Sequence, residues 1–186
     1  MNWLAVIGKF SGLAYQEYKK RQLDEIAAII IEETSNADFS LNLVEDDRFR
    51  IIDCFLNAKQ HGATKLNIRL MAKLLAGHAP DKPIYPDEYL YLAKKISDLS
   101  YEEIVFISAA IKVIKGGIEH PTPAVFWMCL NKNLVPSFFK TEADLLSVAY
   151  SLQRTGLVIS SNIIDGTGYV VLSSLALKIS QMISFE

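Results

Sequence analysis

One stretch near the C-terminus differs in character from the rest of this 186-residue chain. In residues 157–179, LVISSNIIDGTGYVVLSSLALKI, two runs rich in β-forming residues flank the segment IDGTG. Asp165-Gly166 is a pair typical of tight hairpin turns, because both residues tolerate the positive φ that such turns need. Elsewhere apolar residues recur mainly at helical spacing. The sequence therefore predicts a mainly α fold with one antiparallel β-hairpin.

Start and stop signals divide the remaining chain into helices. Residues 3–33 have helical spacing with at most one break. A capping box from Ser100 to Glu103 opens a later helix, and Gly116-Gly117 closes it. By the same reasoning we expect further helices over the ranges 45–62, 64–77, 86–99, 122–134, 141–156 and 174–183.

The chain is expected to have two regions. The first, residues 1–99, contains the N-terminal amphipathic helix and a helical bundle, and the second covers residues 100–186. The second opens with a helix that is apolar on nearly all sides and is therefore expected to be buried. We expect the helical N-terminal half to pack on the C-terminal segment.

The C-terminal region has the order helix, helix, helix, hairpin, helix. With LLSVAYSLQRTGLV running into the hairpin and GYVVLSSLALKI following it, this region resembles the winged-helix superfamily. The resemblance implies a winged-helix-like fold whose third helix and wing contact DNA in many members. The first hundred residues, through HGATKLNIRLMAKLLAG, resemble uncharacterised helical proteins of bacteria and phages, which implies no named activity.

The charges of the winged-helix-like segment argue against DNA as its ligand. Its third helix begins with Glu142 and Asp144, and residues 157–172 contain no Lys or Arg. The whole chain has 19 basic against 21 acidic residues, a formal charge of −2. Because Lys and Arg supply most of the affinity for phosphate, this segment is better suited to contacts with protein.

Three cations form the clearest local basic feature. Lys65, Arg69 and Lys73 recur every four residues, so they are expected on one side of the helix 64–77. Such a stripe can contact an anion, a phosphate or nucleic acid. The alternative is an ordinary solvated face, paired with the acidic residues 45–47.

The N-terminal helix is the second candidate surface. Trp3, Ile7 and Phe10 lie on its apolar stripe, which also holds a Gly8-x-x-x-Gly12 pair. A helix of this kind can bind a partner helix, mediate a homodimer or lie on a membrane surface. It can also pack on its own domain. We favour contact with a protein partner or a second copy.

No pattern in the sequence indicates catalysis. The three histidines lack metal-ligand spacing, and there is no phosphate-binding glycine loop and no nucleophile motif. We therefore expect no metal, no cofactor, no small-molecule substrate and no enzymatic activity. Cys54 and Cys129 lie in apolar runs and are expected to be buried, reduced thiols of a cytoplasmic protein. No segment has the length and apolarity of a membrane span.

The sequence thus favours a non-enzymatic interaction or regulatory protein that uses its winged-helix-like segment and its N-terminal helix for protein contacts. The alternative is a transcriptional regulator of winged-helix type. In that case Lys65, Arg69 and Lys73 would supply phosphate contacts beside the wing.

Overall fold

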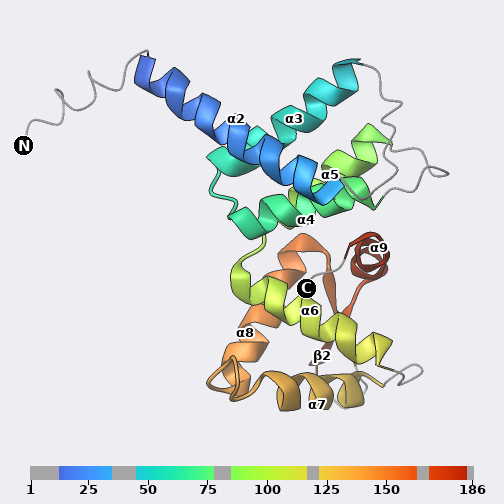
Figure 1. Ribbon diagram of the computed structural model, residues 1–186. Helices are drawn as coiled ribbons and strands as arrows, with labels where there is room; N and C mark the ends of the chain where they lie inside the picture. Colours follow the sequence, from blue (N-terminus) through green and yellow to red (C-terminus); the bar gives the residue numbers. More distant parts are fainter. Residues whose placement is uncertain (1–12, 35–44, 78–84, 117–121, 163–167, 184–186) are drawn as a thin grey trace, which may run out of the picture. The chain divides into compact units, whose positions relative to one another are not determined.

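A computed structural model describes residues 13–34, 45–77, 85–116, 122–162 and 168–183 (Figure 1). Within these ranges the chain forms eight α-helices, one 3-10 turn and a single pair of antiparallel strands. The predicted mainly α fold with one hairpin near the C-terminus is confirmed. The chain divides into two compact units, Met1–Asp98 and Leu99–Glu186.

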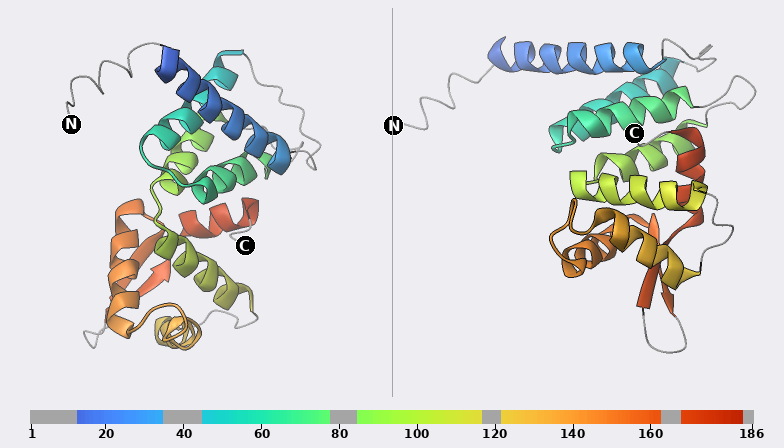
Figure 2. Two further views of the ribbon diagram at one scale, coloured as in Figure 1. Left: turned by 60° about the vertical axis from the view of Figure 1, so that its left-hand side comes forward. Right: turned by 60° about the horizontal axis from the view of Figure 1, so that its bottom comes forward.

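The first unit is entirely helical in its described part. Helix α2 lies across α3 and α4, as both views of Figure 2 show, and α5 packs against α3 and α4. Side chains from α3, α4 and α5 form the centre of its core, where Phe55, Met71 and Tyr89 have no exposed surface. The helices are α2 (Leu13–Thr34), α3 (Glu45–Gln60), α4 (Lys65–Ala76) and α5 (Pro86–Ser97).

Local signals fix the junction between α3 and α4. Gly62 adopts φ +94°, a left-handed conformation that side chains with a Cβ disfavour, and so lets the chain turn after α3. Thr64 then caps α4, and the Asn67 side chain accepts a hydrogen bond from the Thr64 amide at 2.9 Å. Asn67 is buried and its Nδ2 donates to the carbonyl oxygen of Ile96 at 2.8 Å, which ties α4 to α5.

The second unit has the predicted order of three helices, a hairpin and a helix. Strands β1 and β2 pair antiparallel, from Val158 opposite Leu172 to Asn162 opposite Gly168. The predicted turn at Asp165-Gly166 lies outside the described residues. The elements are α6 (Tyr101–Lys115), α7 (Pro123–Leu134), α8 (Glu142–Leu152), the 3-10 turn η1 (Gln153–Thr155), β1 (Val158–Asn162), β2 (Gly168–Leu172) and α9 (Ser174–Met182).

Two further sequence expectations can be compared with the structure. No helix in the described ranges combines the length and the apolarity needed to cross a membrane. Cys54 and Cys129 are both free, but each is half-buried, so the expectation of fully buried thiols was wrong. Each lies at the boundary between the core-facing and solvent-facing sides of its helix, which the apolar sequence neighbours do not reveal.

Candidate functional site

An apolar groove of about 310 Å³ runs between α2 and α3 in the first unit. Among the residues that the structure describes, Arg48 is the one charged side chain in its lining. The other lining residues are aliphatic: Leu23, Ile26, Ala27, Ile30 and Ile31 from α2, Ile51 and Ile52 from α3, and Leu75 from α4.

The groove exists because α2 has more apolar surface than its own unit covers. Ile26 and Ile29 are buried against the neighbouring helices, at 2% and 3% exposure. Leu23, Ala27 and Ile31 follow one another at four-residue spacing and form a second stripe beside them. One helix face suffices to join α2 to its unit, so this second stripe is left at the surface.

The exposure of these side chains is unusual for aliphatic residues. Ile31 is 67% exposed, Ile52 is 41% exposed and Leu23 is 39% exposed. Single exposed aliphatic residues are common on protein surfaces. Here the three exposed side chains line one concave surface built from two helices, and grouped apolar exposure of this kind marks contact sites for other molecules.

The cation stripe of α4 is not a free basic surface. Arg69 donates from Nη2 to both carboxylate oxygens of Glu32 at 2.9 Å, and its Nε lies 3.6 Å from Glu33 Oε1. The guanidinium therefore ties α4 to the end of α2. Lys65 is exposed and Lys73 is half-buried, so the stripe does not present three equivalent cations to solvent.

In the alternative interpretation the stripe was paired with residues 45–47, but Arg69 pairs with carboxylates of α2. Asp47 instead accepts a hydrogen bond from Arg50 at 3.3 Å, one turn along its own helix. The spacing of charges within α4 cannot show that Arg69 lies beside the carboxylates of α2.

A second, polar cleft of about 550 Å³ lies between α3 and α5. Several of its polar side chains are joined to one another or to nearby groups: Asn57 donates to Asp53 at 2.9 Å, and Arg50 donates to Asp87 at 2.5 Å. His61 Nδ1 lies 2.7 Å from the carbonyl oxygen of Asn57. These contacts account for the cleft as a structural feature between two packed helices.

Cys54 lines this cleft but does not have the character of a nucleophile. Burial raises the pKa of its thiol, and the neighbouring Asp53 carboxylate raises it further. A reactive cysteine needs the opposite, an environment that favours the thiolate. In the described residues there is also no group of three or more His, Cys, Asp or Glu side chains placed to hold a metal ion.

The second unit contains a buried carboxylate, Glu103, with only 2% of its surface exposed. Its Oε2 accepts hydrogen bonds from the Ser100 amide and from Arg154 Nη2, both at 2.9 Å. Its Oε1 accepts from Ser151 Oγ at 2.7 Å and from Arg154 Nη1. Burial alone would raise the pKa of Glu103, but the hydrogen bonds from Arg154, Ser151 and Ser100 outweigh it and lower the pKa.

Other polar residues at the two ends of the third helix also make contacts inside the second unit. Gln153 donates to Ser160 Oγ at 2.7 Å, which joins the end of the third helix to β1. Glu142 accepts from the indole of Trp127 at 2.8 Å, and Asp144 completes the capping box of Thr141. Glu142 and Gln153 are thus held by neighbouring elements, and Asp144 by the cap of its own helix.

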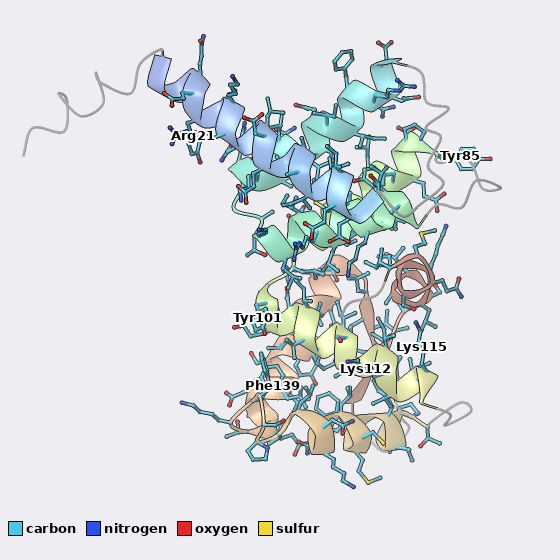
Figure 3. All side chains as sticks on the ribbon, viewed as in Figure 1. Arg21, Tyr85, Tyr101, Lys112, Lys115 and Phe139 are labelled. Carbon is cyan, nitrogen blue, oxygen red and sulfur yellow. The ribbon has the colours of Figure 1, made fainter. Side chains whose placement is uncertain are left out.

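An aromatic cluster lies on the surface of the second unit, where α6 begins and the segment after α7 ends. Figure 3 labels Tyr101 at the start of α6 and Phe139 in the segment after α7. Phe138 lies between them, with ring centroids 5.8 Å from Tyr101 and 4.9 Å from Phe139. Phe139 is buried, so the cluster is the edge of the core rather than a separate site.

The predicted partner contacts Trp3, Ile7 and Phe10 lie outside the described residues. The groove itself was not predicted. A signal for it was present, because residues 26–31, IAAIII, contain more aliphatic side chains than one packed helix face can cover. The buried pair of Glu103 with Arg154 was also missed, since only the capping role of Glu103 can be read from spacing.

Comparison of the chain with protein-family models, with curated proteins and with solved structures found no match. The resemblances to the winged-helix superfamily and to bacterial and phage helical proteins stay predictions.

Proposed function

We propose that this protein acts by binding another protein chain, without a catalytic step, and that the groove between α2 and α3 is the contact site. The observation that carries the proposal is the group of exposed aliphatic side chains that line it, with Ile31 the most exposed. Burying such a surface against a partner is favourable by about 25 cal/mol for each Å² of apolar area removed from water.

The lining of the groove selects the chemistry of its partner. Two helices form its walls, and its lining offers few polar groups for hydrogen bonds. A partner must therefore satisfy its own backbone, as an α-helix does, and present apolar side chains along one face. We propose the winged-helix-like second unit as a further protein-contacting module, and the cytoplasm as the compartment, in keeping with two free cysteines.

Regulation by DNA binding is the weaker proposal. Arg69 is paired with carboxylates of α2, and Arg154 with the buried Glu103. Lys65 is exposed, so it provides the test. Binding to mixed DNA fragments should be absent at physiological salt; salt-sensitive binding that Lys65→Glu weakens would favour the DNA proposal instead.

Site-specific photo-crosslinking tests the proposed contact. A photo-reactive amino acid is placed at position 31 or 52 of the full chain, and crosslinked chains are identified by mass spectrometry. The matched control carries the same group at Tyr91, which is 54% exposed on α5 and does not line the groove.

We expect the same identified protein chain from both groove positions and none from position 91. Leu23→Asp should remove the adducts, because an apolar partner could bind only by removing the new carboxylate from water, which is costly. Adducts shared equally by position 91, or no adduct from either groove position, would refute the proposed function.

A further inference from the structure

We propose that the groove binds residues 3–12 of a second copy of this chain, so that two copies exchange their N-terminal segments. This inference rests on the proposed function of the groove and names its partner. The proposed contact forms between two apolar parts of the chain: the groove between α2 and α3, and the segment that directly precedes α2.

The segment has the chemistry that the groove requires. Residues 1–12, MNWLAVIGKFSG, contain no acidic residue and one lysine. Trp3, Ile7 and Phe10 recur at spacings of four and three, so a helix through them presents all three on one face. An aromatic and aliphatic face of this kind fits a groove lined almost entirely by aliphatic side chains.

The length of the segment argues for a second copy rather than the chain's own segment. Leu13 begins α2, and Ile31 lies 18 residues further along it, about 27 Å away at the helical rise. A helix over residues 3–12 is about 15 Å long. If it turns back at Gly12, it ends near Leu23, the first groove residue of α2, and leaves the rest of the groove uncovered. If it continues the axis of α2, it points away from its own groove.

Two other details disfavour an internal contact. A segment turned back as a helix would lie along residues 13–22 of α2, where Glu17, Lys19 and Arg21 are exposed and charged; Figure 3 shows Arg21 on this half of the helix. An extended segment could reach Ile31, but its backbone N–H and C=O groups would then meet apolar side chains without partners. A segment from another molecule has neither restriction.

Symmetry makes the exchange large enough to be stable. In a twofold dimer each copy gives one segment and receives one, so the contact forms twice. The four aromatic side chains of the two segments would bury about 600 to 1,000 Å². The aliphatic side chains of the segments and the groove walls add to this area, and stable specific interfaces begin at roughly 1,200 Å².

The first experiment measures the mass of the purified full chain by light scattering after size exclusion. Wild type is expected at twice the monomer mass, and Ile7→Asp and Ile31→Asp at the monomer mass. Tyr91→Asp is the control and should stay dimeric. Ile31 is mostly exposed, so its substitution should leave the fold intact, which circular dichroism checks.

The second experiment identifies the contact by disulfide trapping. Cys54 and Cys129 are replaced by Ser, and a chain with Ile7→Cys is mixed under mild oxidation with a size-tagged chain carrying Leu23→Cys or Ile31→Cys. We expect mixed dimers linking position 7 to one of these groove positions, well in excess of dimers linked through identical positions. Tyr91→Cys in place of the groove cysteine should trap little.

The two proposals fail in different ways. A monomeric wild type, or trapping mainly between two groove cysteines, would overturn the exchange of N-terminal segments. If the photo-crosslinks at positions 31 and 52 then lead to another protein, the proposed binding function stands with a different partner. If no crosslink forms from the groove, both proposals are refuted.

Discussion

Replacing Glu103 by Gln should destabilise the second unit by about 2 to 3 kcal/mol at neutral pH. The carboxylate is buried and accepts hydrogen bonds from Ser100, Ser151 and Arg154. Glutamine keeps the size but replaces one acceptor oxygen with a donor, so at least one charge-assisted hydrogen bond to Arg154 is lost. Such bonds contribute about 1.5 to 3 kcal/mol each.

The partial exposure of Arg154 limits the stability that Glu103→Gln should lose. Breaking a fully buried ion pair costs about 3 to 5 kcal/mol, because the remaining charge stays buried. The Arg154 side chain is 48% exposed, so water can solvate it once the carboxylate is gone. Arg154→Ala should therefore cost more than Glu103→Gln, since it leaves the buried carboxylate behind. Ser151→Ala, which removes one hydrogen bond, should cost about 1 kcal/mol.

The assay must report on the second unit alone. The chain has two tryptophans, Trp3 and Trp127, and Trp127 is buried in α7. In a Trp3→Phe background, urea unfolding followed by tryptophan fluorescence reports on Trp127. With a slope of about 1 to 3 kcal/mol per M, the Gln variant should unfold at a urea concentration lower by about 0.7 to 3 M.

The pH dependence gives an independent check with a definite sign. Hydrogen bonding lowers the pKa of Glu103 in the folded chain relative to its unfolded value of about 4.3. Its stabilising contribution is therefore complete above that unfolded value and is lost as the pH falls through the folded pKa. Wild type and Glu103→Gln should converge in acid. Equal stability at neutral pH, or a difference that persists in acid, would refute this account of the pair.

Three further predictions concern the first unit. Gly62→Ala should lower the free energy of unfolding in urea by about 1 to 2 kcal/mol. An added Cβ would meet no atom within 4 Å, so the cost comes from the positive φ alone, and a neutral effect would contradict this. Asn67→Ala should cost about 2 to 3 kcal/mol, since it removes the acceptor of the Thr64 amide and the buried side-chain hydrogen bond to the Ile96 carbonyl, and an effect below that of Gly62→Ala would count against it. Cys54 should react with iodoacetamide more slowly in the folded chain than in urea, and Asp53→Asn should speed the folded reaction; equal rates in both states would disprove the role of burial.

Contacts between residues far apart in the chain could not be predicted from the sequence. The capping box of Ser100 and Glu103 follows from spacing, but Arg154 lies 51 residues further along and nothing in the spacing links them. The same holds for Arg69, because its spacing within α4 does not reveal its partners on α2. Each missed contact depends on which helices meet, and many arrangements of the helices share the same local pattern.

The sequence by itself determined the local structure. Caps such as Ser100 with Glu103, glycines such as Gly62 and the spacing of apolar residues act through hydrogen bonds and side chains only a few residues apart, so they can be read directly. The tertiary structure decided which apolar residues of α2 are covered. Ile29 and Ile31 belong to the same aliphatic run, yet one is 3% exposed and the other 67%. Burial depends on the neighbours that the fold supplies, and from those neighbours follows the groove on which the proposed function rests.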